Sequence, residues 1–556
     1  MYAQESFTDE EYSILSHFFT NTDRPVFAIV NLPEIVKGAM FARYSRTHKS
    51  LRRLFLDEFY EQPDLGIESI ANTASQMNDW KVSVARQRAE ELYQRVFVQY
   101  GDDSVAQLGG AHLACEQVSA ILAKVIERGR LAAYLEQSTR YIYFDEKLRG
   151  EDGYERYRYH VPPEVEKGPL AERYYDTMDR LFESYSFVVH ELTNYFQKRF
   201  PKKPRESRGA YGRATRARAC DTARGLLPAA TTSNIGVFAT GQAYETMLMR
   251  LNASPLGEAR NYSEMMLKEL RKVIFGFLTR VDGKNRGVAW SGYFERIAND
   301  MNAIAREFDR PEEKHEFDIE RDEVKLLEWD DDAEVRIAAA AMYPYSQRSE
   351  DDLLAISAGM KASDRRDVIA TYVGDRTNRR HKPGRGMERV YYRFDVLSDF
   401  GSFRDLQRHR MMTIDWQRLT PRHGYATPPE IEDAGKSVSL RWCEAMGDMK
   451  TLYEEVSSAH GEDVAQYVVP FGFRIRYNIQ MNARQAFHML ELRTGESGHS
   501  DYRRICLKMH DLIRHQAKHR AIADAMSYVD NKDYGLGRLS AERRQTDSEQ
   551  LGFDLL

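Results

Sequence analysis

Basic and hydroxyl side chains recur in two short clusters about 280 residues apart. The first cluster contains Arg128-Gly129-Arg130 and, after seven residues, Ser138-Thr139-Arg140. The second contains Arg408-His409-Arg410 and, after the same interval, Arg418. Arginine forks bind phosphate oxygens through paired hydrogen bonds and stack on planar rings. Arg408-His409-Arg410 therefore suits a dinucleotide that has a pyrophosphate and a flat ring system. The alternative is that these basic residues lie at the end of a helix and bind its carbonyl groups.

The hydroxyl in the first cluster indicates a ligand contact. Ser138 and Arg140 are two residues apart and would point the same way in an extended segment. Together with Gln137 they can hold a nucleotide phosphate or a pyrimidine carbonyl; the alternative is a polar loop. We interpret Ser138 as a ligand rather than a nucleophile, because the sequence identifies no base near it. No catalytic residue is assigned from the sequence.

Matching landmarks follow each cluster in the same order. Pro228 to Arg250 spans 22 residues, and Pro470 to Arg493 spans 23. The other matched pairs are Pro162-Pro163-Glu164 with Pro428-Pro429-Glu430, and Leu227-Pro228 with Val469-Pro470. Because the two halves of the chain share these motifs in the same order and at nearly the same spacing, we predict a tandem repeat of one domain.

A helix in the second copy could serve two neighbouring pockets. Asn482 and Arg493 are eleven residues apart, nearly three helical turns, and would share one stripe about 16 Å long. Arg484 and His488 are four residues apart and would lie on a different face. At the positions of Asn482 and Arg484 the first copy has Ala239 and Gly241, judged by the distance to Arg250.

These residues together resemble the flavin-dependent thymidylate synthases. The family's signature is Arg-His-Arg, seven residues, and Ser, and it ends in Gln-Ser-x-Arg; Ala-Arg-x-x-Leu-Pro and Asn-Ala-Arg follow. The resemblance implies a cofactor-binding set and a substrate-binding set. The first is Arg408, His409, Arg410, Asn482 and Arg484, and the second is Gln137, Ser138, Arg140, Arg224, Arg250 and Arg493.

The resemblance implies a reaction as well as ligands. It is the reductive methylation of deoxyuridylate (dUMP) to thymidylate (dTMP), with methylenetetrahydrofolate as one-carbon donor and FAD recharged by NADPH. Two alternatives remain open: a flavoenzyme of the same fold acting on another pyrimidine nucleotide, or a non-catalytic relative that binds nucleotides or nucleic acid. The resemblance also implies a homodimer, because family sites lie between four subunits and each chain supplies two domains.

Neither copy keeps the whole signature. The first has Gly129 in place of the histidine. The second has Arg418 for the serine, Thr420 for the following arginine, and Gln466 where the first copy has Arg224. The signature residues expected to bind the nucleotide are therefore concentrated in the first copy, and those expected to bind the flavin are concentrated in the second. This complementarity predicts a composite site that joins the two sets.

Length and composition set the architecture. The chain has 556 residues, of which 42% are hydrophobic and 30% charged, as in a globular protein with a large core. We expect a helix-rich α+β fold in two tandem copies, residues 1–306 and 333–556, joined by a charged linker at 307–332. Periodicity predicts helices, and short β-rich runs could be strands. The helices include Arg86–Phe97, Cys115–Arg128, Leu170–Phe200 and Arg504–Tyr528, and the strand candidates are Val26–Val30 and Val390–Phe394.

Net charge, cysteine spacing, the absence of a long apolar run and the histidines indicate the general class of the protein. A net charge of −5 argues against a general nucleic-acid binder, although the basic segment Lys202–Arg218 is either an exposed loop or a clamp for a polyanion. The four cysteines are widely spaced, and no apolar run is long enough for a membrane span, so we expect a cytoplasmic protein. His515 and His519 have the spacing of a metal pair, but we interpret them, with His510, as a solvated helix face. No metal site is expected.

Overall fold

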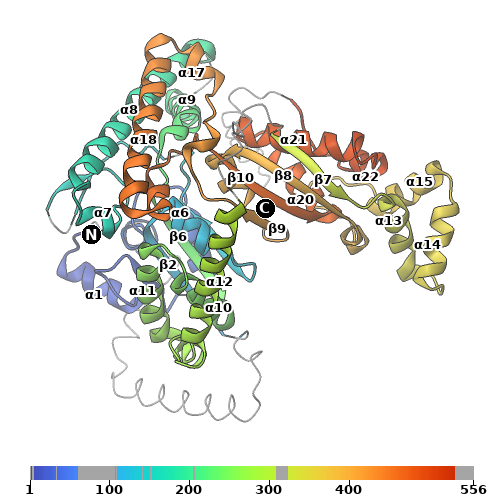
Figure 1. Ribbon diagram of the computed structural model, residues 1–556, viewed down its shortest axis with the longest axis horizontal. Helices are drawn as coiled ribbons and strands as arrows, with labels where there is room; N and C mark the ends of the chain where they lie inside the picture. Colours follow the sequence, from blue (N-terminus) through green and yellow to red (C-terminus); the bar gives the residue numbers. More distant parts are fainter. Residues whose placement is uncertain are drawn as a thin grey trace. The chain divides into compact units, whose positions relative to one another are not determined.

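The computed structural model describes residues 2, 5–32, 34–60, 107, 109–140, 142–150, 153–204, 207–308 and 323–532. The chain forms two compact units, and each unit combines segments from both halves of the sequence (Figure 1). Unit 1 consists of Met1–Phe187, Leu226–His315 and Arg441–Val469. Unit 2 consists of Val188–Gly225, Glu316–Leu440 and Pro470–Leu556.

Each unit contains a four-stranded antiparallel sheet with the same strand order. In unit 1 the order is β1 (Val26–Ile29), β2 (Gly110–Ser119), β6 (Thr232–Thr240) and β3 (Ala132–Glu136). In unit 2 it is β7 (Val324–Trp329), β8 (Tyr391–Asp399), β10 (Arg474–Asn482) and β9 (Thr413–Trp416). The two sheets confirm the predicted helix-rich α+β fold in two copies.

Equivalent helices follow equivalent strands. The second strand of each sheet continues into a short helix, α6 (Ala120–Ile126) or α16 (Phe400–Leu406), which is capped by Ser119 or Asp399. The third strand of each sheet, β6 or β10, continues into α10 (Gly241–Asn252) or α20 (Ala483–Arg493). The Arg-x-Arg tripeptides come directly after α6 and α16, so each copy positions its tripeptide with the same local structure.

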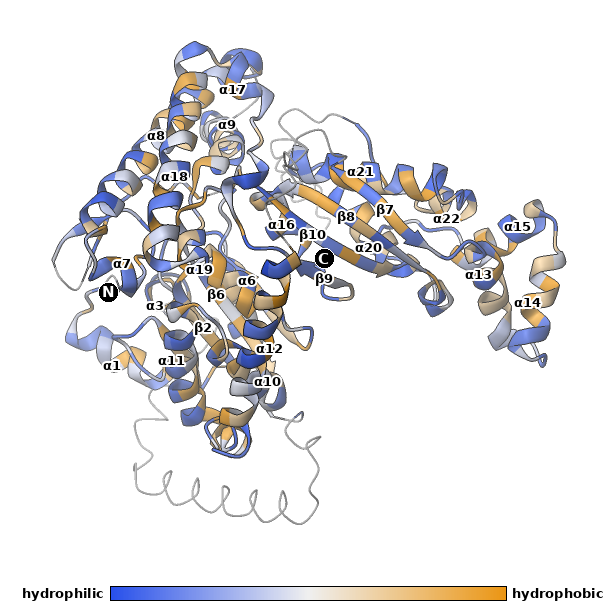
Figure 2. Ribbon diagram, in the orientation of Figure 1, coloured by the Kyte–Doolittle hydropathy of each residue, from blue (hydrophilic) through white to orange (hydrophobic). Residues whose placement is uncertain are grey.

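The apolar faces of the strands and surrounding helices form the cores of the two units. In unit 1, Phe18, Phe27 and Phe55 are fully buried beside the N-terminal helices. In unit 2, Phe394 and Ile479 are fully buried on adjacent strands. Figure 2 shows the hydrophobic colouring along the strands of both sheets.

The remaining helices divide between the units. Those of unit 1 are α1 (Asp9–Phe18), α2 (Glu34–Tyr44), α3 (Leu51–Phe55), α7 (Pro163–Glu166), α11 (Gly257–Ile274), α12 (Gly287–Phe308) and α19 (Glu462–Ala465). Those of unit 2 are α9 (Arg208–Ala223), α13 (Ala333–Met342), α14 (Glu350–Gly359), α15 (Ala362–Val373), α17 (Pro429–Asp433), α21 (Ser500–His515) and α22 (Arg520–Ala525). Two long helices, α8 (Ala171–Arg199) and α18 (Lys436–His460), have residues in both units.

Some of the predicted elements are correct and others are not. The strand at Val26–Val30 and the long helix at Leu170–Phe200 are confirmed as β1 and α8. The helix predicted at Cys115–Arg128 is wrong in its first part, because β2 pairs with β6 as far as Ser119 before α6 begins. The helix predicted at Arg86–Phe97 lies outside the described residues.

Two further predictions are corrected at helix ends. The segment Arg504–Tyr528 is two helices, α21 and α22, because the chain turns at Lys518, whose φ is 62°. The basic segment Lys202–Arg218 is not a loop throughout: α9 begins at Arg208 after the Ser207 N-cap. Arg218 on this helix is ion-paired with Glu430 at 2.9 Å.

The ends of the predicted linker at 307–332 are described and its centre is not. Its first residues complete α12, and its last residues include β7. Among the described helices, none is long and apolar enough to cross a membrane.

Candidate functional site

A cavity of about 210 Å³ lies in unit 2 beside the start of α20. Two residues of the predicted cofactor-binding set, Asn482 and Arg484, line it, and Met411 lines it directly after Arg410. The other lining residues are Lys382, Glu388, Gln485 and His488. The cavity therefore gathers residues from the Arg-His-Arg turn, from α20 and from the segment before β8.

The backbone fixes the two α20 residues in different ways. Asn482 is the N-cap, and its Oδ1 accepts a hydrogen bond from the Gln485 amide at 2.8 Å. Arg484 donates from Nε to the Pro383 carbonyl at 2.9 Å, and its Nη1 lies 3.3 Å from Glu388. In unit 1 the N-cap equivalent to Asn482 is Thr240, one residue after the Ala239 that spacing had matched with it.

Three side-chain nitrogen atoms in the cavity wall are buried and have no hydrogen-bond partner among the described residues. They are Lys382 Nζ, Gln485 Nε2 and His488 Nδ1. Burial lowers the pKa of the Lys382 ammonium. Buried polar groups in native proteins are nearly always paired, so this wall has hydrogen-bonding capacity for a ligand with acceptor atoms.

Two neutral imidazoles connect the cavity to Arg493. His409 is buried, and its Nε2 accepts a hydrogen bond from Arg493 Nε at 2.9 Å. The His409 and His488 ring centroids are 5.3 Å apart in an edge-to-face arrangement. Burial, with Arg493 next, holds the pKa of His409 well below its ordinary value, and burial with Lys382 lowers the pKa of His488 to about 4.

The flanking arginines of the tripeptide lie on the turn. Arg408 and Arg410 are exposed in the turn that follows α16, on either side of the buried His409. Alternation of this kind directs the imidazole inward and leaves the two guanidiniums at the surface.

Arg224, a first-copy residue, lies in unit 2 with second-copy residues. It is buried, and its Nη1 is 3.1 Å from Asp405 Oδ2. The Asp405 carbonyl in turn accepts a hydrogen bond from Arg493 Nη2 at 2.5 Å. A Cβ atom on Gly401 would be 3.1 Å from Arg224 Nε, so the absence of a side chain on α16 makes room for the guanidinium.

Further aspartates surround Arg224. Burial raises the pKa of Asp399, which caps α16, and Arg224 opposes that shift. Burial and the Asp399 charge raise the pKa of Asp501 to about 7. Asp501 also lies 3.5 Å from the Nδ1 of His499, measured from its Oδ2. The region therefore has a carboxyl group that changes protonation near neutral pH.

Three of the predicted substrate-binding residues lie in unit 1, at the end of β3. The Gln137 side chain is fully buried and already bonded: it donates to the Thr47 carbonyl at 2.6 Å and accepts from Arg158 at 3.0 Å. Ser138 Oγ accepts a hydrogen bond from the Arg140 amide at 3.3 Å. Both Ser138 and Arg140 are half-buried.

Arg250, also in unit 1, occupies the place that Arg493 has in unit 2. Its Nη2 would be 3.1 Å from a Cβ on Gly129, and the Tyr134 hydroxyl would be only 2.7 Å from that Cβ. Tyr134 donates a hydrogen bond to the Gly129 carbonyl at 3.2 Å. In the first copy the hydroxyl of Tyr134 thus fills the space where the histidine side chain would begin.

Unit 2 therefore brings together His409, Asn482, Arg484, Arg493 and Arg224. Gln137, Ser138, Arg140 and Arg250 belong to unit 1. Lys382, Asp405 and Asp501 were not predicted from the sequence to belong to the site. Asp405 could have been found by comparing the two copies, because it is a charged residue three positions before Arg408 and the first copy has Val125 at the equivalent position. No motif near Lys382 indicates that it belongs to the site.

Of the three histidines predicted to form a solvated helix face, His515 is exposed on α21, but the prediction is wrong for His519, which is buried at the start of α22. His510 Nε2 is 3.0 Å from the Ala523 carbonyl, His519 Nδ1 is 3.0 Å from the Tyr392 hydroxyl, and His515 is 3.5 Å from Asp511. In the part of the chain that the structure describes, no group of three or more His, Cys, Asp or Glu side chains could hold a metal ion.

Known proteins resemble this chain over almost its whole length. The UPF0159 protein of Chlamydia muridarum is 38% identical over 542 residues, covering 97% of this chain and 98% of the relative. The UPF0159 protein of Chlamydia pneumoniae is 38% identical over 545 residues, covering 98% of each. That of Thermoplasma acidophilum is 30% identical over 538 residues, covering 92% and 98%.

A solved structure also matches, at low similarity. The UMP/dUMP methylase PolB from Streptomyces cacaoi, bound with 5-Br dUMP, has a TM-score of 0.29 and 16% identity, covering 37% of this chain and 93% of that one. At this TM-score the likeness carries no argument about this chain.

The family match covers both copies. The model of the thymidylate synthase complementing proteins, which are the flavin-dependent thymidylate synthases, matches residues 57–274 and 325–517. The first segment contains β2, β3, β6 and α10, and the second contains their counterparts β8, β9, β10 and α20. With two matched segments and two sheets of one topology, the chain belongs to the thymidylate synthase complementing protein (flavin-dependent thymidylate synthase) family.

Proposed function

We propose that this protein is a flavoenzyme that methylates dUMP reductively to dTMP, using FAD, methylenetetrahydrofolate and NADPH. FAD would be held in unit 2 by Arg408, His409, Arg410, Asn482 and Arg484. The nucleotide would be held by Gln137, Ser138, Arg140, Arg224, Arg250 and Arg493. When bound, the flavin supplies the hydride for the reaction, and the protein supplies binding, orientation and electrostatics.

The observation that carries this proposal is the set of unpaired polar atoms in the unit 2 cavity. Lys382, Gln485 and His488 have buried nitrogens with no partner among the described residues, and they line the same cavity as Asn482 and Arg484. Ring carbonyls and phosphate oxygens of a flavin dinucleotide are acceptors that this wall could pair. The donor chemistry of the cavity therefore fits the cofactor that the family implies.

The neutral imidazoles support the same proposal. Because Arg493 donates to His409 Nε2, that nitrogen has no proton, and the Nδ1 tautomer is the one consistent with the bond. Burial and neighbouring cations keep both His409 and His488 unprotonated. A neutral pair can pack against an aromatic ring system without adding positive charge to a region that already has Arg484, Arg493 and Lys382.

The ion pair between Arg224 and Asp405 indicates which part of the nucleotide Arg224 would contact. Asp405 largely neutralises Arg224, which leaves the guanidinium better suited to a neutral pyrimidine carbonyl than to a phosphate dianion. Asp501, whose pKa is about 7, could exchange a proton close to the same guanidinium. We therefore propose that Arg224 contacts the base of the nucleotide.

Flavin content and turnover test the proposal. The purified protein should have a bound-flavin absorption spectrum and convert dUMP to dTMP when the folate and NADPH are added. Arg410→Ala should purify largely free of flavin, because losing a charged bidentate contact costs about 1.5–3 kcal/mol. Arg130→Ala, at the matching position of the first copy, is the control and should keep its flavin. Equal loss of flavin from both variants would contradict the assignment, and flavin without turnover would favour another pyrimidine nucleotide.

A further inference from the structure

A second and larger cavity, of about 320 Å³, lies in unit 1 at the ends of β1 and β2. Its volume is within the usual range of small-molecule sites. Most of its wall comes from residues before position 57, where the family match begins, including Tyr12, Arg24, His48 and Arg52. The cavity is therefore separate from the flavin residues and is built mainly by a part of the chain outside the family match.

An irregularity in β2 shapes the back wall. The pairing of β2 with β6 shifts between Cys115 and Val118, so the strand has a bulge there. Gln117 in the bulge has a φ of 57°, and its amide donates to Asn234 Oδ1 at 3.0 Å. Bulges re-aim side chains, and a non-glycine residue with positive φ is uncommon. Both Gln117 and Asn234 line the cavity.

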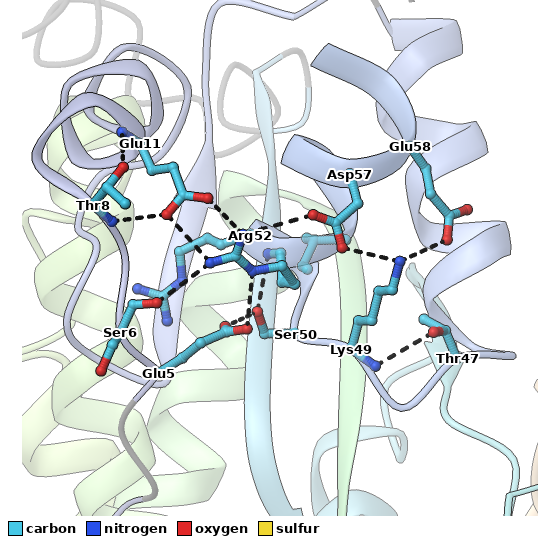
Figure 3. Close-up of polar contacts among 12 residues, drawn as sticks. Glu5, Ser6, Thr8, Glu11, Thr47, Lys49, Ser50, Arg52, Asp57 and Glu58 are labelled. Atoms are coloured by element: carbon cyan, nitrogen blue, oxygen red, sulfur yellow. Dashed lines mark hydrogen bonds and ion pairs between the residues drawn. The ribbon is translucent and has the colours of Figure 1, made fainter. Parts of the chain in front are cut away.

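The charges near the cavity entrance are paired with one another. Figure 3 shows Lys49 beside Asp57 and Glu58, at 3.0 Å and 3.3 Å. Arg53 is 2.6 Å from Glu11. These cations already have counter-charges.

The deeper charges do not balance. Arg158 is buried, which lowers its pKa, and the charge of Glu146 opposes that shift; among the described residues no carboxylate lies within ion-pair distance of Arg158. Its Nη2 donates to the neutral Gln137 side chain at 3.0 Å, its guanidinium lies 5.1 Å from the Phe144 ring centroid, and its Nε has no hydrogen-bond partner. A buried charge without a counter-charge is unfavourable unless something supplies one.

Arg52, also in the wall, has unused donors as well. Its Nη2 donates to the Arg24 carbonyl at 2.9 Å and its guanidinium stacks over Phe27 at 4.2 Å, but Nε and Nη1 are buried with no hydrogen-bond partner in the described part of the chain. The one buried carboxylate nearby, Glu116, lies 3.6 Å from Arg52. It also accepts hydrogen bonds from the Tyr44 hydroxyl at 2.9 Å and the Leu51 amide at 2.8 Å. Glu5, Asp23 and Glu146 also line the cavity but are exposed, so among the described lining residues Glu116 is the buried carboxylate that accompanies two buried guanidiniums.

We propose that this cavity is a binding site for a small organic oxyanion, a phosphate ester or a carboxylic acid, with Arg158 as its main counter-charge and Arg52 as a second donor. Guanidinium forks match the oxygens of phosphate and carboxylate groups, which share this recognition chemistry. Tyr12, Pro25 and Leu148 provide apolar surface for the rest of the molecule. The site goes beyond the proposed flavin reaction: Arg158 is bonded to Gln137 of the proposed nucleotide-binding set, but Gln137, Ser138 and Arg140 do not line this cavity.

Calorimetric titration of the full-length protein tests the site. Inorganic phosphate and succinate are titrated separately at constant ionic strength, because salt screens such contacts. Saturable binding of either anion is expected, and the stronger one identifies the ligand class. Arg158→Gln should weaken that binding about tenfold or more, since it removes a charged partner but keeps an amide. Arg156→Gln, on the same segment but outside the cavity, should bind within about twofold of wild type.

Two further variants make the result decisive. His48→Glu adds a negative charge at an exposed position of the wall and should weaken binding even if Arg158→Gln fails to fold. Arg484→Ala, in the unit 2 cavity, should leave this binding unchanged and so separates the two sites. The proposal is overturned if neither anion saturates, if both Arg158→Gln and His48→Glu bind as wild type, or if Arg484→Ala alone abolishes binding.

Discussion

Individual side chains in unit 2 are arranged so that cations surround unprotonated imidazoles. His409 accepts a hydrogen bond from Arg493, and His488 has Lys382, Arg379 and Arg484 among its charged neighbours. Each cation makes protonation of the imidazoles less favourable, in addition to the effect of burial. The pair is therefore neutral at physiological pH, and the positive charge of the cavity wall comes from the arginines and Lys382.

This arrangement makes stability depend on pH. His488 has a pKa of about 4 in the folded protein and an ordinary value of 6.5. Between these values the unfolded chain binds more protons, so the contribution to stability is complete above 6.5 and is lost as the pH falls toward 4. We expect His488→Gln to reduce the fall in unfolding free energy between about pH 7 and about pH 4.5, measured by urea denaturation.

His515→Gln is the control for that experiment, because His515 is exposed on α21. It should follow the wild-type pH dependence. A His488→Gln profile that runs parallel to wild type across the whole range would show that the imidazole is not held neutral.

At the level of elements, the sequence predicted what local patterns determine. Alternation and periodicity identified β1 and α8, and the spacing of Asn482 and Arg484 placed both at the start of one helix. The strand–helix junction at Ser119 was missed, because the pairing of β2 with β6 decides it rather than any local preference.

Contacts between segments that are distant in the sequence were also not predicted. The repeat predicted that first-copy and second-copy residues would complement each other, but nothing local indicated that Asp405 would be the partner of Arg224. Lys382 reaches the cavity from the segment before β8, where no motif marks it. Such proximity depends on tertiary packing.

The start of α20 allows structural and ligand roles to be separated. Asn482→Ala removes the N-cap and should lower the unfolding free energy by about 1 kcal/mol, in addition to weakening flavin binding. Asn482→Ser retains a capping oxygen, so we expect nearly full stability but reduced flavin affinity, measured by denaturation and by flavin fluorescence titration.

Ser349→Ala provides the matched control, since Ser349 caps α14 and lies outside the cavity. It should cost a similar free energy without affecting flavin. If Asn482→Ser binds flavin as wild type does, Asn482 has a capping role only.

At the level of the whole molecule, the copies defined by sequence and the units defined by contacts are different divisions. Each unit contains one family-type sheet together with segments from the other half of the chain. Arg224, for example, follows the motifs of the first copy but belongs to the unit that has Asp405 and Arg493. This interleaving is consistent with the complementary loss of signature residues in the two copies.

We predict that the protein is a homodimer and that α12 contributes to the interface. Large apolar side chains recur on α12 at intervals of three or four residues and are exposed: Trp290, Tyr293, Ile297, Met301, Ile304 and Phe308. Such a stripe spans about 27 Å of helix and could pair with its copy across a two-fold axis. The helix lies outside both segments of the family match.

Light scattering should give about 129 kDa, twice the chain mass of 64.5 kDa. Ile297→Glu combined with Met301→Glu should shift the protein toward the monomer, because charge on an apolar seam is costly. Asn299→Glu, on the polar side of α12, should remain dimeric. A wild-type monomer at micromolar concentration would contradict the dimer.

The sequence predicts that flavin ligands from the second copy and nucleotide ligands from the first copy act together in one reaction. Parallel binding measurements on Arg408→Ala and Arg140→Ala test it most directly, with flavin followed by absorbance and dUMP by titration. We expect Arg408→Ala to lose flavin but still bind dUMP, and Arg140→Ala to keep flavin but bind dUMP about tenfold or more weakly. If both variants lose the same ligand, or if Arg140→Ala binds dUMP as wild type does, the composite site is contradicted.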